Sequence, residues 1–416
     1  MKRREPITLF EHERLRIGER GFGQKHFERL VRWNEANGDK FFTIGHKAIK
    51  CTQYVGVVQV GDLVVQVLPK ADRTGDADKW RQALLTMLRT VHRLPLTSTN
   101  ETHLHRRHSS ILDFFYDLFV QDVHGLVRRG LVKKYRRRSG NLTALKGRID
   151  WPIHLRDNLL HKERFHVQHQ VYDRDHLLHA LLKQALGIVR RTTVAPLIAG
   201  RVDDVSWAFE EVTDLVLDRR ALERIRLDRK TKPYARAVDL ARMIVLGHSP
   251  DVHAGDMPLV GLLFNMNDLF ERFVLRVLHR AADAHPELDV DVTGQARVPF
   301  WARKVIKPDI VLRVKREEAV ETVIMDTKWK VPRDGQPADA DLKQMFAYNV
   351  QLGSTRSVLL YPSSEGLKPT ASNYHAGHWT SHVEHGCGLA YADLFDEGGK
   401  LRPEAGGQLL TELLIQ

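Results

Sequence analysis

The sequence has few cysteines and no long apolar run, and both absences restrict its class. Cys51 and Cys387 are the only cysteines among 416 residues. Two are too few for a disulfide framework, so we expect a reducing, cytoplasmic compartment. No apolar run reaches the roughly 18 residues of a membrane span, so we expect no membrane association. The N-terminal residues 1–15 are basic but lack the apolar core of a secretory signal.

The sequence also lacks the glycine-rich motif of P-loop nucleotide hydrolases. No GxxxxGK[ST] occurs, and the segment Gly21–Lys25 has a different spacing. We therefore do not expect this chain to hydrolyse nucleoside triphosphates at a P-loop of its own.

Acidic residues are in deficit, and the excess of basic ones is unevenly distributed. The net charge is +12 with a pI near 9.6, which indicates an anionic partner. Residues 101–170 contain 14 Lys and Arg against 7 Asp and Glu, and seven of the eleven residues in 128–138 are basic. This block is able to follow a phosphate backbone, face an acidic protein, or form a solvated helix end, and the sequence leaves the three open.

The length and the pattern predict an α+β protein of two or three domains. Residues 1–100 are β-rich, and a helix is expected at 76–92. Residues 101–255 are mainly helical, with helices expected at 109–138, 175–190 and 234–246. The segment 249–258 is rich in Pro, Gly and Asp, which is typical of a boundary. Residues 256–416 then form a C-terminal domain.

The C-terminal domain contains the most informative segment, residues 307–330. Asp309 follows a proline and precedes an apolar run, and Asp326 and Lys328 end a second apolar run. A hairpin between the two runs would bring the three side chains together. Two carboxylates suit a hard cation such as Mg²⁺, and the Thr327 backbone carbonyl is a possible further ligand. A neighbouring lysine orients water and offsets phosphate charge.

Two expected helices flank this segment. The helix at 261–285 has an apolar stripe with Glu271 at its edge, and this position by itself predicts a solvated surface residue. The helix at 338–352 places Gln344 and Tyr348 on one face, where they reach a DNA phosphate or brace the lysine. Otherwise this helix simply packs its apolar side chains. Strands are expected near 288–294 and at 357–362.

This arrangement resembles the PD-(D/E)xK nuclease signature. Pro-Asp and Asp-x-Lys each occur by chance in many chains, but here they stand at hairpin spacing between matching elements. The resemblance implies a mixed sheet flanked by helices for residues 256–416. It also implies hydrolysis of DNA phosphodiester bonds with Mg²⁺ or Mn²⁺.

The whole chain is similar to the McrC family. The similarity extends over YVGVV, the LPK that ends at Lys70, RRGLVKKY, LKGRID, YDRDHLLHALLKQAL, MNDLFERFV, and the KPD, DTK and QMFAY motifs. It implies the endonuclease subunit of a McrBC-type restriction system, whose N-terminal half docks into a hexameric AAA+ GTPase, McrB, and stimulates it. It assigns catalysis to Asp309, Asp326 and Lys328, with Glu271 and Gln344. Asp309 follows Lys-Pro in this sequence, whereas Arg-Pro is also common at this position in the family, which is a mild difference. The absence of a P-loop is consistent with a subunit whose partner chain carries out the nucleotide hydrolysis.

Two other functions stay open at this point. One is a regulatory subunit that activates an AAA+ motor while its nuclease fold is inert. The other is a stand-alone repair-type nuclease that needs no motor. The intact Asp309, Asp326 and Lys328 argue against the first.

Overall fold

The computed structural model describes residues 6–70, 76–92, 111–249, 258–316, 319–330, 332, 335–363, 367–375 and 383–415. Its contacts define two compact units. The first comprises residues 1–5, 58–64 and 104–262, and the second comprises residues 6–57, 65–103 and 263–416. This division groups much of the expected N-terminal region with the C-terminal domain. The functional assignment of the ranges 1–100, 101–255 and 256–416 stays a prediction.

The N-terminal part of the second unit combines short strands with two helices. The β-rich character expected of residues 1–100 and the helix expected at 76–92 are present, whereas helix α1 was not expected. Asp76 caps α2 by accepting hydrogen bonds from two backbone N–H groups. Strands β2, β4 and β3 form an antiparallel sheet. A second sheet has the order β1-β6-β5-β11-β10, in which β10 (His248–Ser249) and β11 (Leu259–Asn265) come from later in the chain. The elements are β1 (Ile7–Phe10), β2 (Arg14–Arg16), α1 (Gln24–Ala36), β3 (Phe42–Gly45), β4 (Ala48–Cys51), β5 (Tyr54–Val60), β6 (Leu63–Leu68) and α2 (Ala77–Val91).

The middle of the chain is mainly helical but carries a three-stranded antiparallel sheet, β7-β9-β8. The helix expected at 109–138 is wrong at its C-terminal end. It stops at Arg129 because Gly130 takes a left-handed φ of 87°, and the basic residues that follow belong to β7. Its expected serine start lies outside the described residues. The elements are α4 (Ile111–Arg129), β7 (Lys134–Leu142), β8 (Arg148–Ile149), α5 (Trp151–Asn158), β9 (Phe165–Asp173), α6 (Leu177–Thr192), α7 (Pro196–Ser206), α8 (Arg219–Glu223), α9 (Ala235–Gly247) and β10 (His248–Ser249).

The C-terminal part contains a mixed sheet of the order β12-β15-β16-β17-β19-β18. The expected helix at 261–285 is wrong at its start, since residues up to Asn265 extend β11 and the Asn265 side chain caps the helix that follows. Strands β18 and β19 were not expected. The elements are β11 (Leu259–Asn265), α10 (Met266–Ala284), β12 (Val290–Gly294), β13 (Val298–Trp301), β14 (Lys304–Ile306), β15 (Ile310–Lys315), β16 (Val320–Thr327), α11 (Asp339–Leu352), β17 (Arg356–Pro362), β18 (Thr370–Asn373), β19 (Gly386–Ala392) and α12 (Ala405–Ile415).

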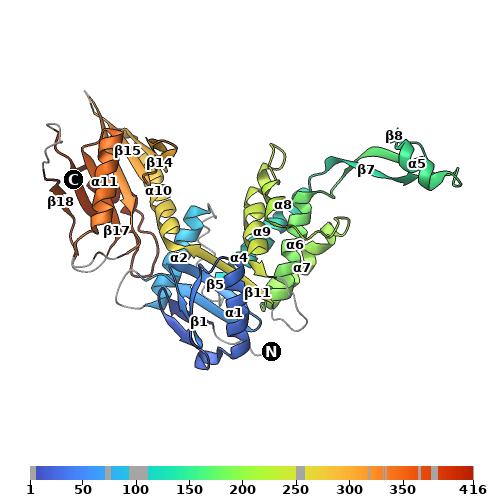
Figure 1. Cartoon of the computed structure of the whole chain (residues 1–416), viewed down its shortest axis with the longest axis horizontal. Coiled ribbons are helices and arrows are strands. Elements are labelled where there is room, and N and C mark those ends of the chain that lie inside the picture. Colours follow the sequence, from blue (N-terminus) through green and yellow to red (C-terminus); the bar gives the residue numbers. More distant parts are fainter. Residues whose placement is uncertain are drawn as a thin grey trace. The chain divides into compact units, whose positions relative to one another are not determined.

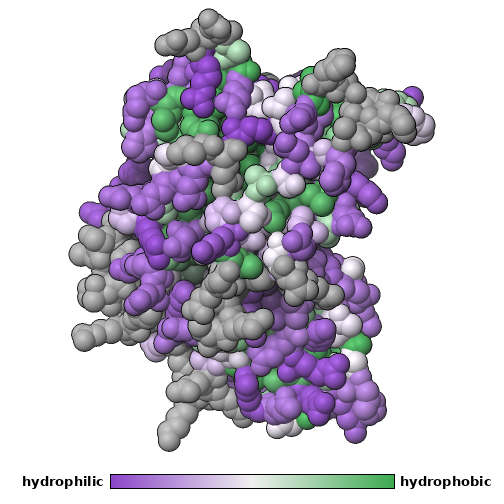
Figure 2. Space-filling view, turned by 90° about the vertical axis from the view of Figure 1, so that its left-hand side faces the viewer, coloured by the Kyte–Doolittle hydropathy of each residue, from purple (hydrophilic) through white to green (hydrophobic). Residues whose placement is uncertain are grey.

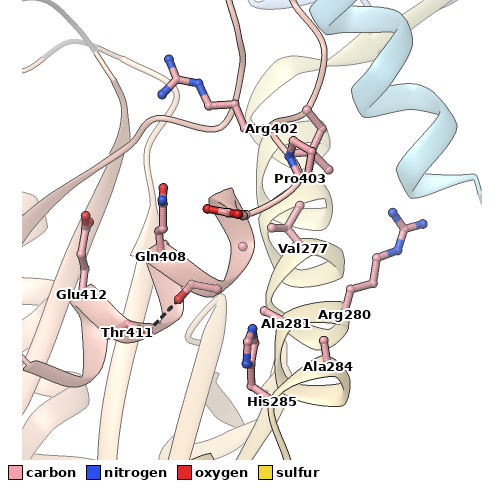
Figure 3. A pocket seen from close by; sticks show the side chains of 14 residues that line it. Val277, Arg280, Ala281, Ala284, His285, Arg402, Pro403, Gln408, Thr411 and Glu412 are labelled. Atoms are coloured by element: carbon pink, nitrogen blue, oxygen red, sulfur yellow. Dashed lines mark hydrogen bonds between the residues drawn. The ribbon is translucent and has the colours of Figure 1, made fainter.

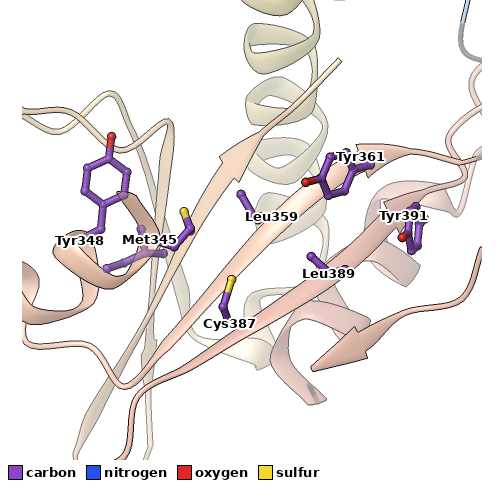
Figure 4. Close-up of a cluster of buried hydrophobic side chains, with 8 residues drawn as sticks. Met345, Tyr348, Leu359, Tyr361, Cys387, Leu389 and Tyr391 are labelled. Carbon is purple, nitrogen blue, oxygen red and sulfur yellow. The ribbon is translucent and has the colours of Figure 1, made fainter. Parts of the chain in front are cut away.

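Helix α11 packs against β16, β17 and β19, as the view of the sheet indicates (Figure 1). The core between them contains side chains from alternate positions of each strand (Figure 4). Its buried members are Ile324, Met345, Tyr348, Leu359, Tyr361, Cys387, Leu389 and Tyr391. Because Asp326 lies two residues after Ile324 on the same strand, its side chain is directed toward the α11 face. The fold thus places one predicted site residue beneath the helix that carries Gln344.

Helix α10 packs against β12 and β16 and also contacts α2 and α12. It carries Glu271 on its second turn. None of the helices in the described ranges combines the length and the apolar composition that crossing a membrane requires.

Candidate active site

Asp309 and Asp326 lie side by side at one end of the β15–β16 hairpin. The antiparallel register pairs Ile310 with Met325, so the residue before Ile310 stands opposite the residue after Met325. Thr327 fixes the orientation of Asp309, because its backbone N–H and its hydroxyl both donate to Asp309 Oδ2, at 2.8 and 2.9 Å. Asp326 is only 3% exposed. The hairpin that the spacing predicts is present, and it brings the two carboxyl groups together.

The two acids oppose each other's ionisation. Burial raises the pKa of Asp326 to about 6, and the neighbouring charge of Asp309 adds to the effect. Burial also raises the pKa of Asp309, with a further contribution from the charge of Glu271. A group of acids held in this way gains free energy when a cation joins it. The electrostatics of the site therefore favour a bound positive charge.

Lys328 supplies one positive charge. Its Nζ lies 2.5 Å from Asp326 Oδ2 and 3.4 Å from Asp341 Oδ1. Burial works against a charged ammonium, but these contacts raise the pKa of Lys328 above its ordinary value. The backbone N–H of Lys328 donates to the Leu360 carbonyl at 2.8 Å, which continues the pairing of β16 with β17. The lysine predicted from sequence is thus held as a cation beside Asp326.

Asp341 is a site residue that the sequence analysis missed. It lies in the first turn of α11, is 8% exposed, and contacts Lys330 Nζ at 2.6 Å as well as Lys328. A weak signal was available, because Asp341 precedes Gln344 by three residues and therefore shares its helix face. The aspartate anchors both lysines from the helix opposite the strand.

Gln344 contacts an acid and not the lysine. Its Nε2 donates to Asp326 Oδ1 at 3.3 Å and to the Tyr348 hydroxyl at 2.7 Å. The Tyr348 hydroxyl in turn donates to the Lys307 carbonyl at 3.3 Å. Gln344 and Tyr348 share one face of α11, as their spacing predicts. The pair connects this helix to Asp326 and to the chain just before Asp309.

Glu271 faces the same region without touching either aspartate. Its Oε1 accepts a hydrogen bond from Gln295 Nε2 at 2.7 Å. Burial raises its pKa, the charge of Lys307 lowers it, and the charge of Asp326 raises it further. These influences place Glu271 within electrostatic range of the hairpin. Glu271 is half-buried and hydrogen-bonded to Gln295. It is therefore not the solvated surface residue that was one of the two possibilities from the sequence.

The oxygen ligands of the hairpin suit a divalent hard cation. Among the described residues, no group of three or more Asp, Glu, His or Cys side chains is arranged to hold a metal ion. Two carboxylates are nevertheless compatible with Mg²⁺, which commonly binds through one or two carboxylates and keeps several waters. Asp309 and Asp326 provide these two groups, and burial is the main cause of their raised pKa values.

Trp329 connects the site to distant parts of the chain. Its ring lies 5.1 Å from that of Phe270, the neighbour of Glu271, and 6.0 Å from that of Trp80 in α2. Its Nε1–H donates to Glu11 Oε2 at 3.0 Å. The residue that follows Lys328 is therefore packed between α10 and the N-terminal segments of the same unit.

A cavity of about 780 Å³ lies apart from these residues, between α10 and α12 (Figure 3). Gly406 and Gly407 let the two helices approach, since a Cβ at either position would lie 3.0 Å from a side chain of α10 or of His285. None of the candidate catalytic residues lines this cavity. The candidate site lies where β15 meets β16, two inner strands of the six-stranded sheet.

The basic block 128–138 belongs in part to a long β7–β9 hairpin (Figure 1). Arg136 pairs with Asp173 and Asp175, and Lys134 pairs with Asp228, so part of the charge is neutralised within the fold. The region between β7 and β9 exposes large apolar side chains. They are Leu145, Trp151, Leu155, Leu159 and Leu160, at 54–91% exposure.

Comparisons with known proteins identify a family and similar folds. Residues 49–362 match the family of the McrBC 5-methylcytosine restriction system component. No curated protein matches the chain. Among solved structures, the chain is similar to one in a refined half-complex from the tetradecameric assembly of Thermococcus gammatolerans McrB AAA+ hexamers with bound McrC. The TM-score is 0.69 at 20% identity, with 99% of both chains covered.

A second structure, the Thermococcus gammatolerans McrBC complex, matches with a TM-score of 0.49 at 22% identity, over 66% of this chain and 88% of that one. At the identity of the first match, the likeness shows a common fold. The family match covers well over half of the sequence. This chain therefore belongs to the McrBC 5-methylcytosine restriction system component family, in agreement with the resemblance to McrC that its motifs predict.

Proposed function

We propose that this chain is the endonuclease subunit of a McrBC-like restriction complex and hydrolyses DNA phosphodiester bonds with Mg²⁺ or Mn²⁺. The observation that carries the proposal is the pair of adjacent carboxyl groups, half-buried Asp309 and buried Asp326, with Lys328 paired to the second at 2.5 Å. The β15–β16 hairpin, the mixed sheet, and the flanking helices α10 and α11 support a PD-(D/E)xK nuclease domain. The family match supports the restriction system.

Asp309 and Asp326 would hold the cation, with the Thr327 carbonyl as a further oxygen ligand. The cation, when bound, supplies Lewis-acid polarisation of a phosphoryl oxygen and a more acidic water. Thr327 keeps Asp309 in one orientation through its two hydrogen bonds. Gln344 does the same for Asp326 from the opposite side. Both carboxylates are thereby arranged before the substrate arrives.

Lys328 orients the attacking water and stabilises the negative charge that develops on the phosphate. Its raised pKa keeps it charged throughout the physiological range. When the cation occupies Asp326, Asp341 remains as the second anionic contact of the ammonium group. Glu271 adds negative charge at the edge of the site and favours binding of the cation.

The test is cleavage of DNA by the full chain with its AAA+ partner, GTP and Mg²⁺. Asp326→Asn and Lys328→Met keep the side-chain size and should reduce cleavage by about a hundredfold or more, the usual effect of losing one electrostatic group. Assembly with the partner should survive. Asp291→Asn, an exposed acid of the same sheet, is the matched control. Undiminished cleavage by either site variant would reject the assignment. Cleavage by the chain alone, unaffected by GTP, would indicate a stand-alone nuclease.

We further propose that the exposed apolar group between β7 and β9 contacts an AAA+ GTPase partner. Leu160 is 91% exposed and Trp151 is 59% exposed, which is unfavourable without a partner. Leu160→Asp with Trp151→Ala should abolish stimulation of the partner's GTPase and weaken the complex in size-exclusion chromatography. Trp207→Ala, at 62% exposure elsewhere in this unit, should have little effect. A regulatory subunit without nuclease activity would show the GTPase effect but no cleavage.

A further inference from the structure

Strands β13 and β14 form a small hairpin that is separate from the six-stranded sheet. Its side chains are unusually exposed for apolar residues. Trp301 is 71% exposed, Phe300 is 53% exposed and Val305 is 52% exposed. A two-stranded hairpin of this kind contributes little stability by itself. Its aromatic side chains are therefore not explained by the core of the protein.

The charge of this hairpin has one sign. Residues 295–308 contain four Lys and Arg and no Asp or Glu. Arg297, Arg303 and Lys304 are exposed. Within the described ranges, no ion pair joins these three side chains to an acidic residue. Their charge is thus available to an outside ligand, in contrast to that of Arg136 and Lys134 on β7.

The face shown in Figure 2 is mostly hydrophilic, with hydrophobic side chains in small patches.

The hairpin is attached directly to the candidate site. Gln351 Nε2, on α11, donates to the Pro299 carbonyl at 3.0 Å. The Tyr348 hydroxyl, which also contacts Gln344, donates to the Lys307 carbonyl at 3.3 Å. Trp301 precedes Asp309 by eight residues, so the two lie at most about 28 Å apart along an extended chain. A ligand of the hairpin therefore lies within about eight base pairs of the scissile bond, at roughly 3.4 Å for each base pair.

We propose that the β13–β14 hairpin is a DNA-binding element of the nuclease. Arg303, Lys304 and Arg297 contact phosphates, and Trp301 with Phe300 packs against bases or enters a base step. This inference rests on the proposed nuclease function and adds to it the element that holds the duplex beside the hairpin of Asp309 and Asp326. Clustered basic residues with exposed aromatic rings are suited to nucleic acid, because cations neutralise phosphates and rings stack on bases. Protein interfaces are also enriched in aromatic residues and Arg, so the preference for nucleic acid rests on the charge of the hairpin, which is positive throughout.

The experiment measures binding of the full chain to a short, unmodified, fluorescein-labelled duplex DNA by anisotropy, with EDTA in place of Mg²⁺. Arg303→Ala with Lys304→Ala should lower the affinity and reduce the slope of log K against log salt by about 0.9 for each lost phosphate contact. Trp301→Ala should lower the affinity on the order of tenfold, the usual effect of losing one stacked base, and leave the salt slope unchanged. Trp301→Phe should restore most of the binding.

Lys315→Ala with Arg316→Ala is the matched control. It removes the same charge from the end of β15 that lies away from Asp309, and both residues are more than half exposed. This control should bind DNA like the unmodified chain. If the two double variants lose DNA affinity equally, then the loss depends only on net charge and the proposal is overturned. Hairpin variants that bind DNA normally would also overturn the proposal. The same holds for hairpin variants that lose only binding to the AAA+ partner or self-association.

The two proposals fail in different ways. Asp326→Asn should bind DNA normally in EDTA but not cleave it with Mg²⁺. If the unmodified chain binds DNA through the hairpin yet never cleaves it, then the nuclease proposal fails and the hairpin assignment stands. If cleavage depends on Asp326 but not on Trp301, Arg303 or Lys304, then the nuclease proposal stands and the hairpin assignment fails.

Discussion

The burial of Glu11 makes the stability of this protein depend on pH. Glu11 is 7% exposed, and its Oε2 accepts a hydrogen bond from Trp329 Nε1–H at 3.0 Å. Burial raises the pKa of Glu11 to about 8, although the hydrogen bonds from Trp329 and from the Lys70 backbone lower it in part. The carboxyl group is therefore protonated in the folded protein at neutral pH. In the unfolded chain it ionises near its ordinary value of 4.5.

The sign of the effect follows from these two pKa values. Below pH 4.5 the group is protonated in both states and does not oppose folding. Above that, the unfolded chain gains free energy by ionising, so stability falls by about 1.4 kcal/mol for each pH unit until pH 8. Between pH 6 and pH 9, the loss attributable to Glu11 is about 3 kcal/mol on this basis. The full penalty above pH 8 is roughly 5 kcal/mol.

Glu11→Gln removes the ionisable group and retains an oxygen that accepts from Trp329. We expect this variant to be more stable than the unmodified chain at pH 9, and to differ little near pH 5. Urea unfolding followed by tryptophan fluorescence reports on this core, because Trp80 and Trp329 lie in it. Glu35→Gln, an exposed acid on α1, is the control. If the unmodified chain and Glu11→Gln lose the same stability between pH 6 and pH 9, the reasoning is refuted.

The candidate site could be predicted largely because it is local. Asp309 and Asp326 are 17 residues apart and joined by two apolar runs, so a single hairpin determines their meeting. The antiparallel register then places Thr327 on Asp309 without any long-range information. Asp341 escaped prediction for a related reason. It lies beyond a loop, in the first turn of α11, and its spacing of three residues from Gln344 was only a weak sign that it faces the strand.

Errors in the middle of the chain arose at the ends of elements. A hydrophobic stripe followed by basic residues favours a continuous helix, but Gly130 ends α4 and the next segment pairs with β9. In β7 the side chains of Lys134 and Arg136 are partly buried, and those of Tyr135 and Arg137 are exposed. The sequence does not show this alternation, because cations occupy both faces of the strand around Tyr135.

The pairing of distant segments had no local signal. Residues 6–57 and 65–103 share a compact unit with 263–416, and the contact of Glu11 with Trp329 spans 318 residues. The sequence around either residue does not predict its contact with the other, because a glutamate beside an apolar strand predicts only an exposed position. Long-range packing of this kind is decided by the fit of whole surfaces and not by any motif. It nevertheless determines what surrounds the residue next to Lys328.

Two further predictions concern positions near α2 and in the site. Gly399→Ala should destabilise the protein by roughly 2–3 kcal/mol, because φ is +76° and a Cβ would lie 2.2 Å from a backbone oxygen of α2. Gly353→Ala, at φ +67° in open space, should cost only about 1 kcal/mol in the same urea measurement. In single-turnover cleavage, Asp341→Asn should slow the reaction about tenfold, an effect of 1.4 kcal/mol, because Lys328 loses its second anchor. Lys330→Met removes the other ion pair of Asp341 and should leave the rate nearly unchanged. Equal slowing by both variants would mean that Asp341 only stabilises the start of α11 and does not position Lys328.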